Sequence, residues 1–463
     1  MPYDDLRAFL GRLESEGELA RIQVPVDIEH EVGAVTRRAL DLGGVERNKA
    51  LLFERPRGFG IPIAVNVVST RKRYCLAIDT TPEKFHGQWM ERIKRPLEPR
   101  IISDGPCKEN IRLAEQVNLF DFPHPLWNEK DGSQYITAPC VISKDPDTGA
   151  RNVGVYRLMV HDGRTTGILM ESYRHVRMHQ EKARARGERL PVAIAIGVDP
   201  AIWIAAVAPF PCGVDELAMA GALRGKPVDL VKCETIPLEV PASAEIVLEG
   251  EILPNVMKQE GPFGEFPGYY SGQGERHIIE IKAITHRNSP LYQGSYVGKP
   301  PHEDNVMRCL SHEVEILSQC AHQPIRKIRV TEGGCGGFFV IASISKRFEG
   351  QGKMVGMSIL GTTPPGRWIK NLILVDEDVD PFDWTQVEWA MSTRFQPERD
   401  IEVIRDVTGS VLDPSLPNRA SMKSSKIIID ATMPATGQFP ELAHPKKEVM
   451  AMVQKEWEKY GIA

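Results

Sequence analysis

NVGVYRLMVHD, residues 152–162, is typical of the short β-branched runs that decide the fold class of this 463-residue chain. Similar runs recur between about residues 115 and 300, with turn residues between them. They are ITAPCVISKD (136–145), TTGILMES (165–172), PVAIAIGV (191–198), DLVKCETI (229–236), AEIVLEGEI (244–252), HIIEIKAITHR (277–287) and PLYQGSYVG (290–298). Many short strands at fairly even spacing are typical of a β-barrel or a β-sandwich. We therefore expect such a core, interrupted by helices at 175–187 and 213–224.

The segments on either side of this core mix helices and strands. Residues 1–110 predict helices at 4–16 and 30–42 and strands at 51–54 and 61–68. EDNVMRCLSHEVEILSQC (303–320) predicts a long amphipathic helix, whose apolar stripe is Val306, Leu310, Val314 and Leu317. Residues 322–440 return to a mixed pattern. HPKKEVMAMVQKEWEKYG (444–461) predicts a terminal helix that docks on its own chain or on a neighbouring subunit.

These patterns predict an α/β (α+β) chain in four parts. They are an N-terminal α/β segment (1–110), a barrel domain (111–302), a connector helix (303–321) and a C-terminal α/β oligomerisation domain that ends in the docking helix (322–463). The length agrees with two or three domains at roughly 150 residues each.

The composition narrows the class of protein. A formal net charge of −5 argues against nucleic acid or an anionic membrane as the main partner. There is no apolar run of 18 residues, and the first residues carry acids where a signal peptide carries lysines. The eight cysteines are scattered and form no C-x-x-C pair. We expect a cytoplasmic protein whose cysteines are reduced and mostly buried.

The stretch KQEGPFGEFPGYYSGQG (258–274) places two carboxylates, Glu260 and Glu265, around a Gly-Pro-Phe-Gly corner. Two carboxylates held together push their pKa values apart, so that one can act as an acid while the other stays ionised. Such a pair needs a nearby cation. Arg157, in the middle of an apolar strand, is a candidate because a buried arginine also needs a partner. A turn with solvated acids remains the alternative reading of this motif alone.

Three further side chains suggest a cation site. Asn152 precedes the apolar run, His175 stands at a predicted helix start, and Glu234 lies inside the predicted strand DLVKCETI. An amide oxygen, an imidazole and a carboxylate suit Mn²⁺ or Mg²⁺ better than structural zinc. The spacing leaves open whether the three converge, and a histidine such as His175, taken alone, is more often an ordinary helix-start residue than a ligand.

Four motifs, in this order and at these separations, resemble the UbiD family of reversible decarboxylases that depend on prenylated FMN. They are NVGVYR (152–157), the RH pair (174–175), KCET (232–235) and EGPFGE (260–265). The resemblance extends over essentially the whole chain, including VDEDVD (375–380). It implies a split β-barrel that binds prenylated FMN, a flavin to which a separate flavin prenyltransferase has added a fourth ring.

The resemblance also implies roles for individual residues. Asn152, His175 and Glu234 match the ligands of a divalent metal, Mn²⁺ (or Mg²⁺), which with K⁺ holds the flavin phosphate. Glu260, Arg157 and Glu265 match the proton-transfer network, with Glu265 as the proton donor. The residues expected to line the cofactor are Asn152, Val153, Gly154, Val155, Tyr156, Arg157, Arg174, His175 and Glu234.

The substrate is expected to be an aromatic or heteroaromatic carboxylic acid, such as a hydroxybenzoate or a furan or pyrrole carboxylate. In SYVGKPPHEDNVMR (295–308), Lys299, His302 and Arg308 are candidates to bind a polar substituent, or else are solvated or paired with Glu303 and Asp304. An arylacrylic acid is the alternative substrate. A non-catalytic flavin-binding subunit of a carboxylase complex, and a plain flavin oxidoreductase, are the alternative functions. We also expect a homodimer or larger homo-oligomer.

Three other motifs predict structure rather than chemistry. The glycine-rich GGCGGFFVIAS (333–343) precedes a strand and does not open a helix, so it predicts a turn and no dinucleotide site. VDEDVD (375–380) predicts a strand end, and the basic RKR (71–73) predicts a solvated loop.

Overall fold

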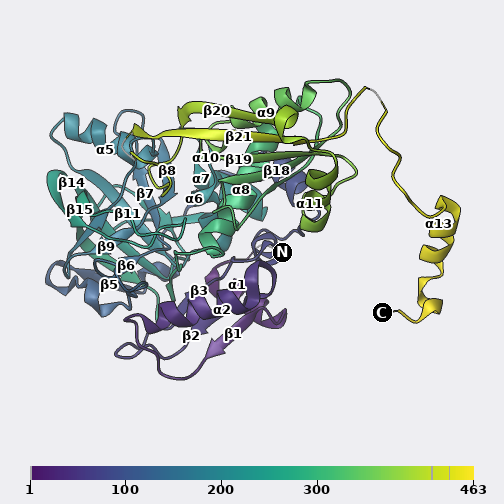
Figure 1. The fold of residues 1–463 in the computed structure, drawn as a ribbon. Helices are drawn as coiled ribbons and strands as arrows, with labels where there is room; N and C mark the ends of the chain where they lie inside the picture. Colours follow the sequence, from purple (N-terminus) through teal and green to yellow (C-terminus); the bar gives the residue numbers. More distant parts are fainter. Residues whose placement is uncertain (1–2, 419–420, 437, 463) are drawn as a thin grey trace.

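The computed structural model describes residues 3–418, 421–436 and 438–462. Figure 1 shows an N-terminal α/β part, a β-rich middle and a C-terminal α/β part, with the last helix standing apart. Among the described residues, no helix is both long and apolar enough to cross a bilayer. All eight cysteines are free, and five of them are buried, as predicted.

The N-terminal part is a small sheet covered by helices. Its elements are α1 (Leu6–Ser15), β1 (Leu19–Ile22), α2 (Glu31–Arg47), β2 (Ala50–Phe53), β3 (Ile63–Val65), α3 (Arg71–Ala77) and α4 (Phe85–Arg92). The sheet order is β1-β2-β3-β16, where β16 (Tyr292–Gln293) comes from the barrel segment. Asp5 caps α1 by accepting the Ala8 N–H at 2.8 Å. The apolar side of α1 is fully or nearly fully buried, as its spacing predicts.

The prediction of a solvated loop at residues 71–73 is wrong. Thr70 caps a helix there by accepting the Arg73 N–H, and the Arg73 side chain is fully buried. Arg71 reaches Glu313 on α8 and Glu332 at the edge of the C-terminal part. Acidic residues far away in the sequence therefore pair with these arginines and compensate for their burial. The sequence near residues 71–73 gives no sign of those partners.

The middle of the chain is an antiparallel sheet that curls into a half-barrel, which confirms the predicted barrel-like core (Figure 1). The strand order is β6-β9-β10-β15-β14-β11-β7-β8, and β5 also pairs with β15. The bounds are β5 (Asn110–Leu113), β6 (Tyr135–Ile136), β7 (Cys140–Lys144), β8 (Arg151–Val155), β9 (Leu158–Val160), β10 (Thr165–Ile168), β11 (Leu190–Ile196), β14 (Ile246–Glu260) and β15 (Gly274–His286).

Helices and a second small sheet flank the half-barrel. The helices are α5 (His175–Ala185), α6 (Pro200–Val207) and α7 (Glu216–Arg224). The sequence predicts α5 and α7 but not α6, because α6 is apolar all round and has no amphipathic period. The small sheet has the order β13-β12-β4, with β4 (Arg100–Ile101), β12 (Asp229–Lys232) and β13 (Glu239–Pro241).

The long helix α8 (Glu303–Gln319) joins the half-barrel to the C-terminal part. The apolar stripe of α8 packs into the core as predicted. The C-terminal sheet has the order β17-β18-β19-β21-β20, parallel in its middle and antiparallel at both edges. Its elements are β17 (Ile325–Val330), β18 (Phe339–Ile344), α9 (Gln351–Leu360), α10 (Pro365–Trp368), β19 (Asn371–Asp376), α11 (Trp384–Thr393), α12 (Pro397–Asp400), β20 (Ile401–Thr408) and β21 (Lys423–Ala431).

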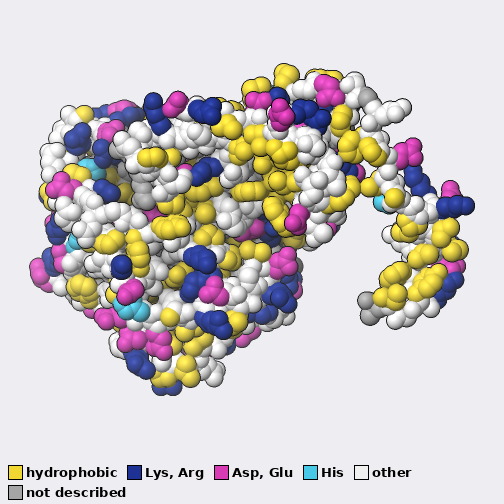
Figure 2. All heavy atoms as spheres, in the orientation of Figure 1, with side chains coloured by type: hydrophobic (Ala, Val, Ile, Leu, Met, Phe, Trp, Pro, Cys, Tyr) yellow, Lys and Arg dark blue, Asp and Glu magenta, His cyan; other side chains and the backbone are white. Residues whose placement is uncertain are grey.

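The terminal helix α13 (Lys447–Lys455) stands away from the body of the molecule (Figure 1). It has no buried residue, and Figure 2 shows hydrophobic side chains along it. Those at least 45% exposed in and after the helix are Val449, Met450, Met452, Trp457, Tyr460 and Ile462. This helix therefore does not dock on its own chain.

Candidate active site

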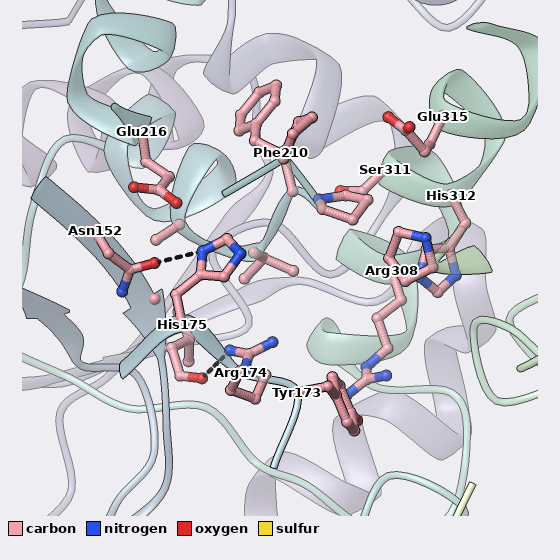
Figure 3. Close-up of a pocket in the computed structure, with 18 of the residues that line it drawn as sticks. Asn152, Tyr173, Arg174, His175, Phe210, Glu216, Arg308, Ser311, His312 and Glu315 are labelled. Carbon is pink, nitrogen blue, oxygen red and sulfur yellow. Dashed lines mark hydrogen bonds between the residues drawn. The ribbon is translucent and has the colours of Figure 1, made fainter. Parts of the chain in front are cut away.

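A cavity of about 670 Å³ lies between the half-barrel, α8 and the C-terminal part (Figure 3). The half-barrel side contributes β8 and the segments 171–175 and 206–211, and α7 contributes Glu216. The opposite wall comes from α8 and α10. Its residues are Asp304, Arg308, Ser311, His312, Glu315, Gln319, Thr363, Pro364, Arg367 and Trp368.

One corner of the cavity gathers polar side chains from three elements. Asn152 lies on β8, His175 begins α5 and Glu216 begins α7 (Figure 3). His175 Nδ1 donates to Asn152 Oδ1 at 2.9 Å, and Glu216 Oε2 accepts the Val153 N–H at 2.8 Å. Asp215 holds the start of α7 by accepting the Leu217 N–H. Strand and helix ends thus aim all three groups at one place.

The electrostatics of this corner suit a cation. Burial raises the pKa of Glu216 to about 8, and burial lowers the pKa of His175. A buried carboxylate that lacks a cation is destabilised, so an ion bound between these groups would relieve its desolvation.

The structure does not bring Glu234 to this corner, which corrects the prediction that placed it there. Strand β12 ends at Lys232, so Glu234 lies in the following bend, outside the cavity and exposed. Its Oε1 accepts from Lys108 Nζ at 2.8 Å, and its N–H donates to Glu249. Glu216 lies beside the other two predicted ligands instead. The sequence signal for Glu216 was an acidic residue at the first position of an otherwise apolar helix.

The predicted cofactor-lining residues occupy the half-barrel wall. Residues 152–156, Arg174 and His175 all line the cavity. The Nη2 of Arg174 donates to the Val155 carbonyl at 2.9 Å, and its guanidinium lies 4.6 Å from the centre of the Tyr156 ring. Arg157 does not line the cavity but turns toward the acidic corner at the end of β14.

Arg157 joins both carboxylates of that corner, as the sequence predicts. Its Nε donates to Glu260 Oε1 at 2.9 Å, and its Nη1 donates to Glu265 Oε1. The side chains of Arg157 and Glu260 are 7% and 0% exposed, so solvent screens their attraction little. The guanidinium also lies 5.0 Å from the centre of the Phe263 ring.

Glu265 has an environment that favours its acid form. Burial raises its pKa above the usual value, and the nearby Glu171 adds to this effect, while Arg157 and Arg308 oppose it. The corner is held by the Gly264 N–H, which donates to Asp131 at 2.8 Å. A carboxyl group with a raised pKa holds its proton to higher pH than an ordinary glutamate and can release it to a bound molecule.

The trio Glu260, Arg157 and Glu265 lies next to the cavity rather than in its wall. Phe266 lies between the trio and the cavity. The guanidinium of Arg308, in the cavity wall, lies 4.3 Å from the centre of the Phe266 ring. Arg308 also lies 5.1 Å from the ring of Trp368. One arginine therefore packs between the acidic corner and the C-terminal wall of the cavity.

Of the three predicted substrate residues, the structure places only Arg308 in the cavity wall. Lys299 has an exposed side chain outside the cavity. His302 is fully buried, with Nε2 3.2 Å from the Phe266 carbonyl oxygen. Lys299 thus matches the solvated alternative, whereas His302 belongs to the packing around the acidic corner.

The sequence predictions singled out Arg308 on the polar side of α8 but not the other polar residues there, which recur at the helical spacing away from the apolar stripe. The polar residues of α8 that line the cavity are Asp304, Arg308, Ser311, His312, Glu315 and Gln319. The sequence signal for this cavity wall was a polar stripe opposite the apolar stripe, on a helix that joins two parts of the chain.

Models of three domains match the chain. Residues 10–93 match the 3-octaprenyl-4-hydroxybenzoate carboxy-lyase N-terminal domain, 100–300 its Rift-related domain and 305–431 its C-terminal domain. The phenolic acid decarboxylase of Bacillus subtilis is 38% identical over 476 residues, which cover 99% of this chain and 98% of that protein.

Solved structures agree. The UbiD-class enzyme HmfF from Pelotomaculum thermopropionicum in complex with FMN has a TM-score of 0.88 and 34% identity, covering 97% of this chain and 99% of that chain. An evolved dimeric form of HmfF in complex with prFMN has a TM-score of 0.86 and 34% identity, covering 96% and 97%. The vanillic acid decarboxylase of Sedimentibacter hydroxybenzoicus, in closed form, has a TM-score of 0.88 and 34% identity, covering 99% of each chain. The chain therefore belongs to the UbiD family and is a carboxy-lyase.

Proposed function

We propose that this enzyme is a non-oxidative, reversible decarboxylase of an aromatic or heteroaromatic carboxylic acid that works with prenylated FMN. The observation that carries the proposal is the buried trio of Glu260, Arg157 and Glu265 beside a cavity large enough for a flavin and a small acid. The relatives named above, a phenolic acid decarboxylase and a vanillic acid decarboxylase among them, support the same reaction class.

The residues present fit the implied cofactor. We propose that Asn152, His175 and Glu216 hold Mn²⁺ (or Mg²⁺), which with K⁺ would bind the flavin phosphate. The buried carboxylate of Glu216, beside the amide oxygen of Asn152 and the imidazole of His175, supports this assignment. The amide oxygen of Asn152 is the third group of the set, beside the imidazole of His175 and the carboxylate of Glu216. The bound flavin would supply the electron sink that no side chain offers for the developing carbanion.

The protein supplies the proton. In our proposal the protonated carboxyl of Glu265 delivers its proton to the carbon atom that CO2 leaves. Arg157 holds Glu265 in place through Nη1 and Glu260 through Nε. The aromatic ring of Phe263 over the guanidinium helps to exclude water from this ion pair.

The cavity wall favours a substrate with a polar substituent. Arg308 uses Nε to donate to Asp304 at 2.8 Å, and its two Nη groups donate to no described residue. A hydroxybenzoate, or a furan or pyrrole carboxylate, offers an oxygen or nitrogen substituent that suits such a wall. An apolar arylacrylic acid would leave these donors unpaired.

We also propose the partners that this chemistry needs. A flavin prenyltransferase would supply the cofactor, and a second copy of the chain would cover the exposed apolar face of α13 in a homodimer or larger homo-oligomer. The cytoplasm is the expected location.

The test is turnover. Protein co-expressed with a flavin prenyltransferase would be incubated with a panel of hydroxybenzoates, furan and pyrrole carboxylates and arylacrylates, and released CO2 and product would be measured. We expect CO2 from at least one aromatic acid, and release that is slower by about 10²- to 10⁴-fold from the matched Glu265→Gln variant. A protein that carries prenylated FMN but releases no CO2 from any acid would instead support a non-catalytic flavin-binding subunit.

A further inference from the structure

His312 stands on the polar side of α8 and faces the cavity one helical turn beyond Arg308 (Figure 3). Its Nδ1 lies 3.0 Å from the carbonyl oxygen of Gly336, in the loop between β17 and β18. A carbonyl oxygen can only accept, so Nδ1 carries the hydrogen. The ring is therefore held in one tautomer and one orientation by the C-terminal part.

This arrangement leaves Nε2 as a hydrogen-bond acceptor. Burial lowers the pKa of His312 to about 4, with Arg308 adding to the effect, so the imidazole is neutral at pH 7. The charged groups that act on it are Arg308 and Asp304 from its own helix and Glu313 beside it. Nε2 makes no hydrogen bond to a described residue.

An acceptor and a donor thus share one wall of the cavity. Arg308 offers two Nη groups without described partners, and its guanidinium is fixed between the rings of Phe266 and Trp368. A buried acceptor that finds no donor costs free energy, so this wall penalises a bound group that can accept but not donate.

We infer that His312 is a specificity-determining residue, whose Nε2 accepts a hydrogen bond from a hydroxyl group on the ring of the substrate. The inference rests on the proposed function and deepens it, because it names the residue that distinguishes a hydroxylated aromatic acid from its methoxylated counterpart. A methoxy oxygen still accepts from Arg308 but cannot donate to Nε2.

Two substitutions separate this role from a structural one. In His312→Asn the side-chain amide can replace Nδ1 and keep the Gly336 bond, but it is too short to present an acceptor where Nε2 stood. In His312→Gln the amide oxygen can reach the position of Nε2, while the bond to Gly336 is lost. Both variants would be prepared as full-length protein loaded with prenylated FMN, and flavin content would be compared with the wild type.

The experiment measures Kd by calorimetry and kcat/KM for 2-, 3- and 4-hydroxybenzoate and the matching methoxybenzoates. We expect the wild type to prefer at least one hydroxy acid over its methoxy analogue by roughly ten- to a hundredfold. His312→Asn should abolish this preference, and His312→Gln should retain part of it.

Two results would overturn the inference. One is a wild type that binds and decarboxylates aromatic acids without distinguishing hydroxy from methoxy substituents. The other is a preference that survives in His312→Asn and disappears in His312→Gln, which is the pattern of a purely structural histidine. Both results leave the proposed function standing, whereas a wild type that releases no CO2 from any aromatic acid contradicts the proposed function itself.

Discussion

The Nε of Arg157 donates to Oε1 of Glu260 at 2.9 Å across 103 residues of sequence, and so joins the end of β8 to the end of β14. The same guanidinium reaches Glu265 through Nη1. One cation therefore fixes two carboxylates that the chain places five residues apart. The two carboxylates are therefore held in position by Arg157, which follows β8, as well as by the turn between them.

Replacing Glu265 by glutamine should remove turnover without removing the cofactor. The amide keeps the size and a hydrogen bond to Arg157 but has no acidic proton to deliver. Since general acid catalysis contributes about 10²- to 10⁴-fold, we expect kcat to fall by that order. Steady-state CO2 release, measured beside flavin content, checks this. Unchanged turnover in a flavin-loaded variant would contradict the role of Glu265.

The pH profile should report the raised pKa of Glu265. Its acid form is the donor, so turnover falls as pH rises through its pKa, and burial places that fall above the ordinary range for a glutamate. Removing the opposing cation in Arg157→Gln should raise this pKa further. The residual activity of the variant should then persist to higher pH than that of the wild type. A fall at the same or a lower pH would argue against Glu265 as the titrating group.

Glu216 and Glu234 provide a matched pair for the metal site. Glu216→Gln should lose bound manganese and flavin together, because it removes the charged ligand from the cavity corner. Glu234→Gln should keep both, since Glu234 pairs with Lys108 outside the cavity. Elemental analysis and flavin absorbance of the purified proteins measure the two quantities. Loss of manganese in the Glu234 variant alone would reverse our assignment.

Glu313 should stabilise the junction between α8 and the N-terminal part. Burial opposes its ionisation, but Arg71 outweighs burial and lowers its pKa to about 2. This contribution is present above the unfolded pKa and is lost as pH falls from about 4.5 toward 2. Glu313→Ala leaves Arg71 without its main partner and should cost about 3–5 kcal/mol. Denaturant unfolding at pH 7 checks this, and at pH 3 the difference between the two proteins should be smaller.

The helix α13 should be required for self-association. Met452→Asp places a charge on its apolar face and should shift the protein toward monomer in sedimentation velocity. Gln454→Asp, on the opposite face, should leave the oligomer unchanged. A monomeric wild type, or equal effects of both substitutions, would remove the helix from the interface.

The sequence predicts those parts whose signals are local. The spacing of Leu6, Phe9, Leu10 and Leu13 predicts the buried side of α1, and alternating β-branched runs predict the half-barrel. The trio of Glu260, Arg157 and Glu265 was also predictable, because buried charges need partners and few candidates were available.

The sequence predictions were wrong where contacts between residues far apart in the sequence decide the local structure. Glu234 looked buried because DLVKCETI reads as one strand, yet the backbone N–H groups of Glu234 and Thr235 bind the buried Glu249 and end the strand at Lys232. Arg71 and Arg73 looked solvated because their partners lie far away in the sequence. Apart from Arg308, the polar residues of α8 were missed because the same helix also carries a clear apolar stripe.

The proposed reaction depends on the binding of prenylated FMN in the cavity between the half-barrel and the C-terminal part. The most direct test is mass spectrometry of the flavin released from wild-type protein that was co-expressed with a flavin prenyltransferase, supplied with manganese and exposed to oxygen. We expect the mass of prenylated FMN from the wild type and none of it from Glu216→Gln. Unmodified FMN or no flavin in the wild type would show that prenylated FMN is not the cofactor, and the buried trio would then need another function.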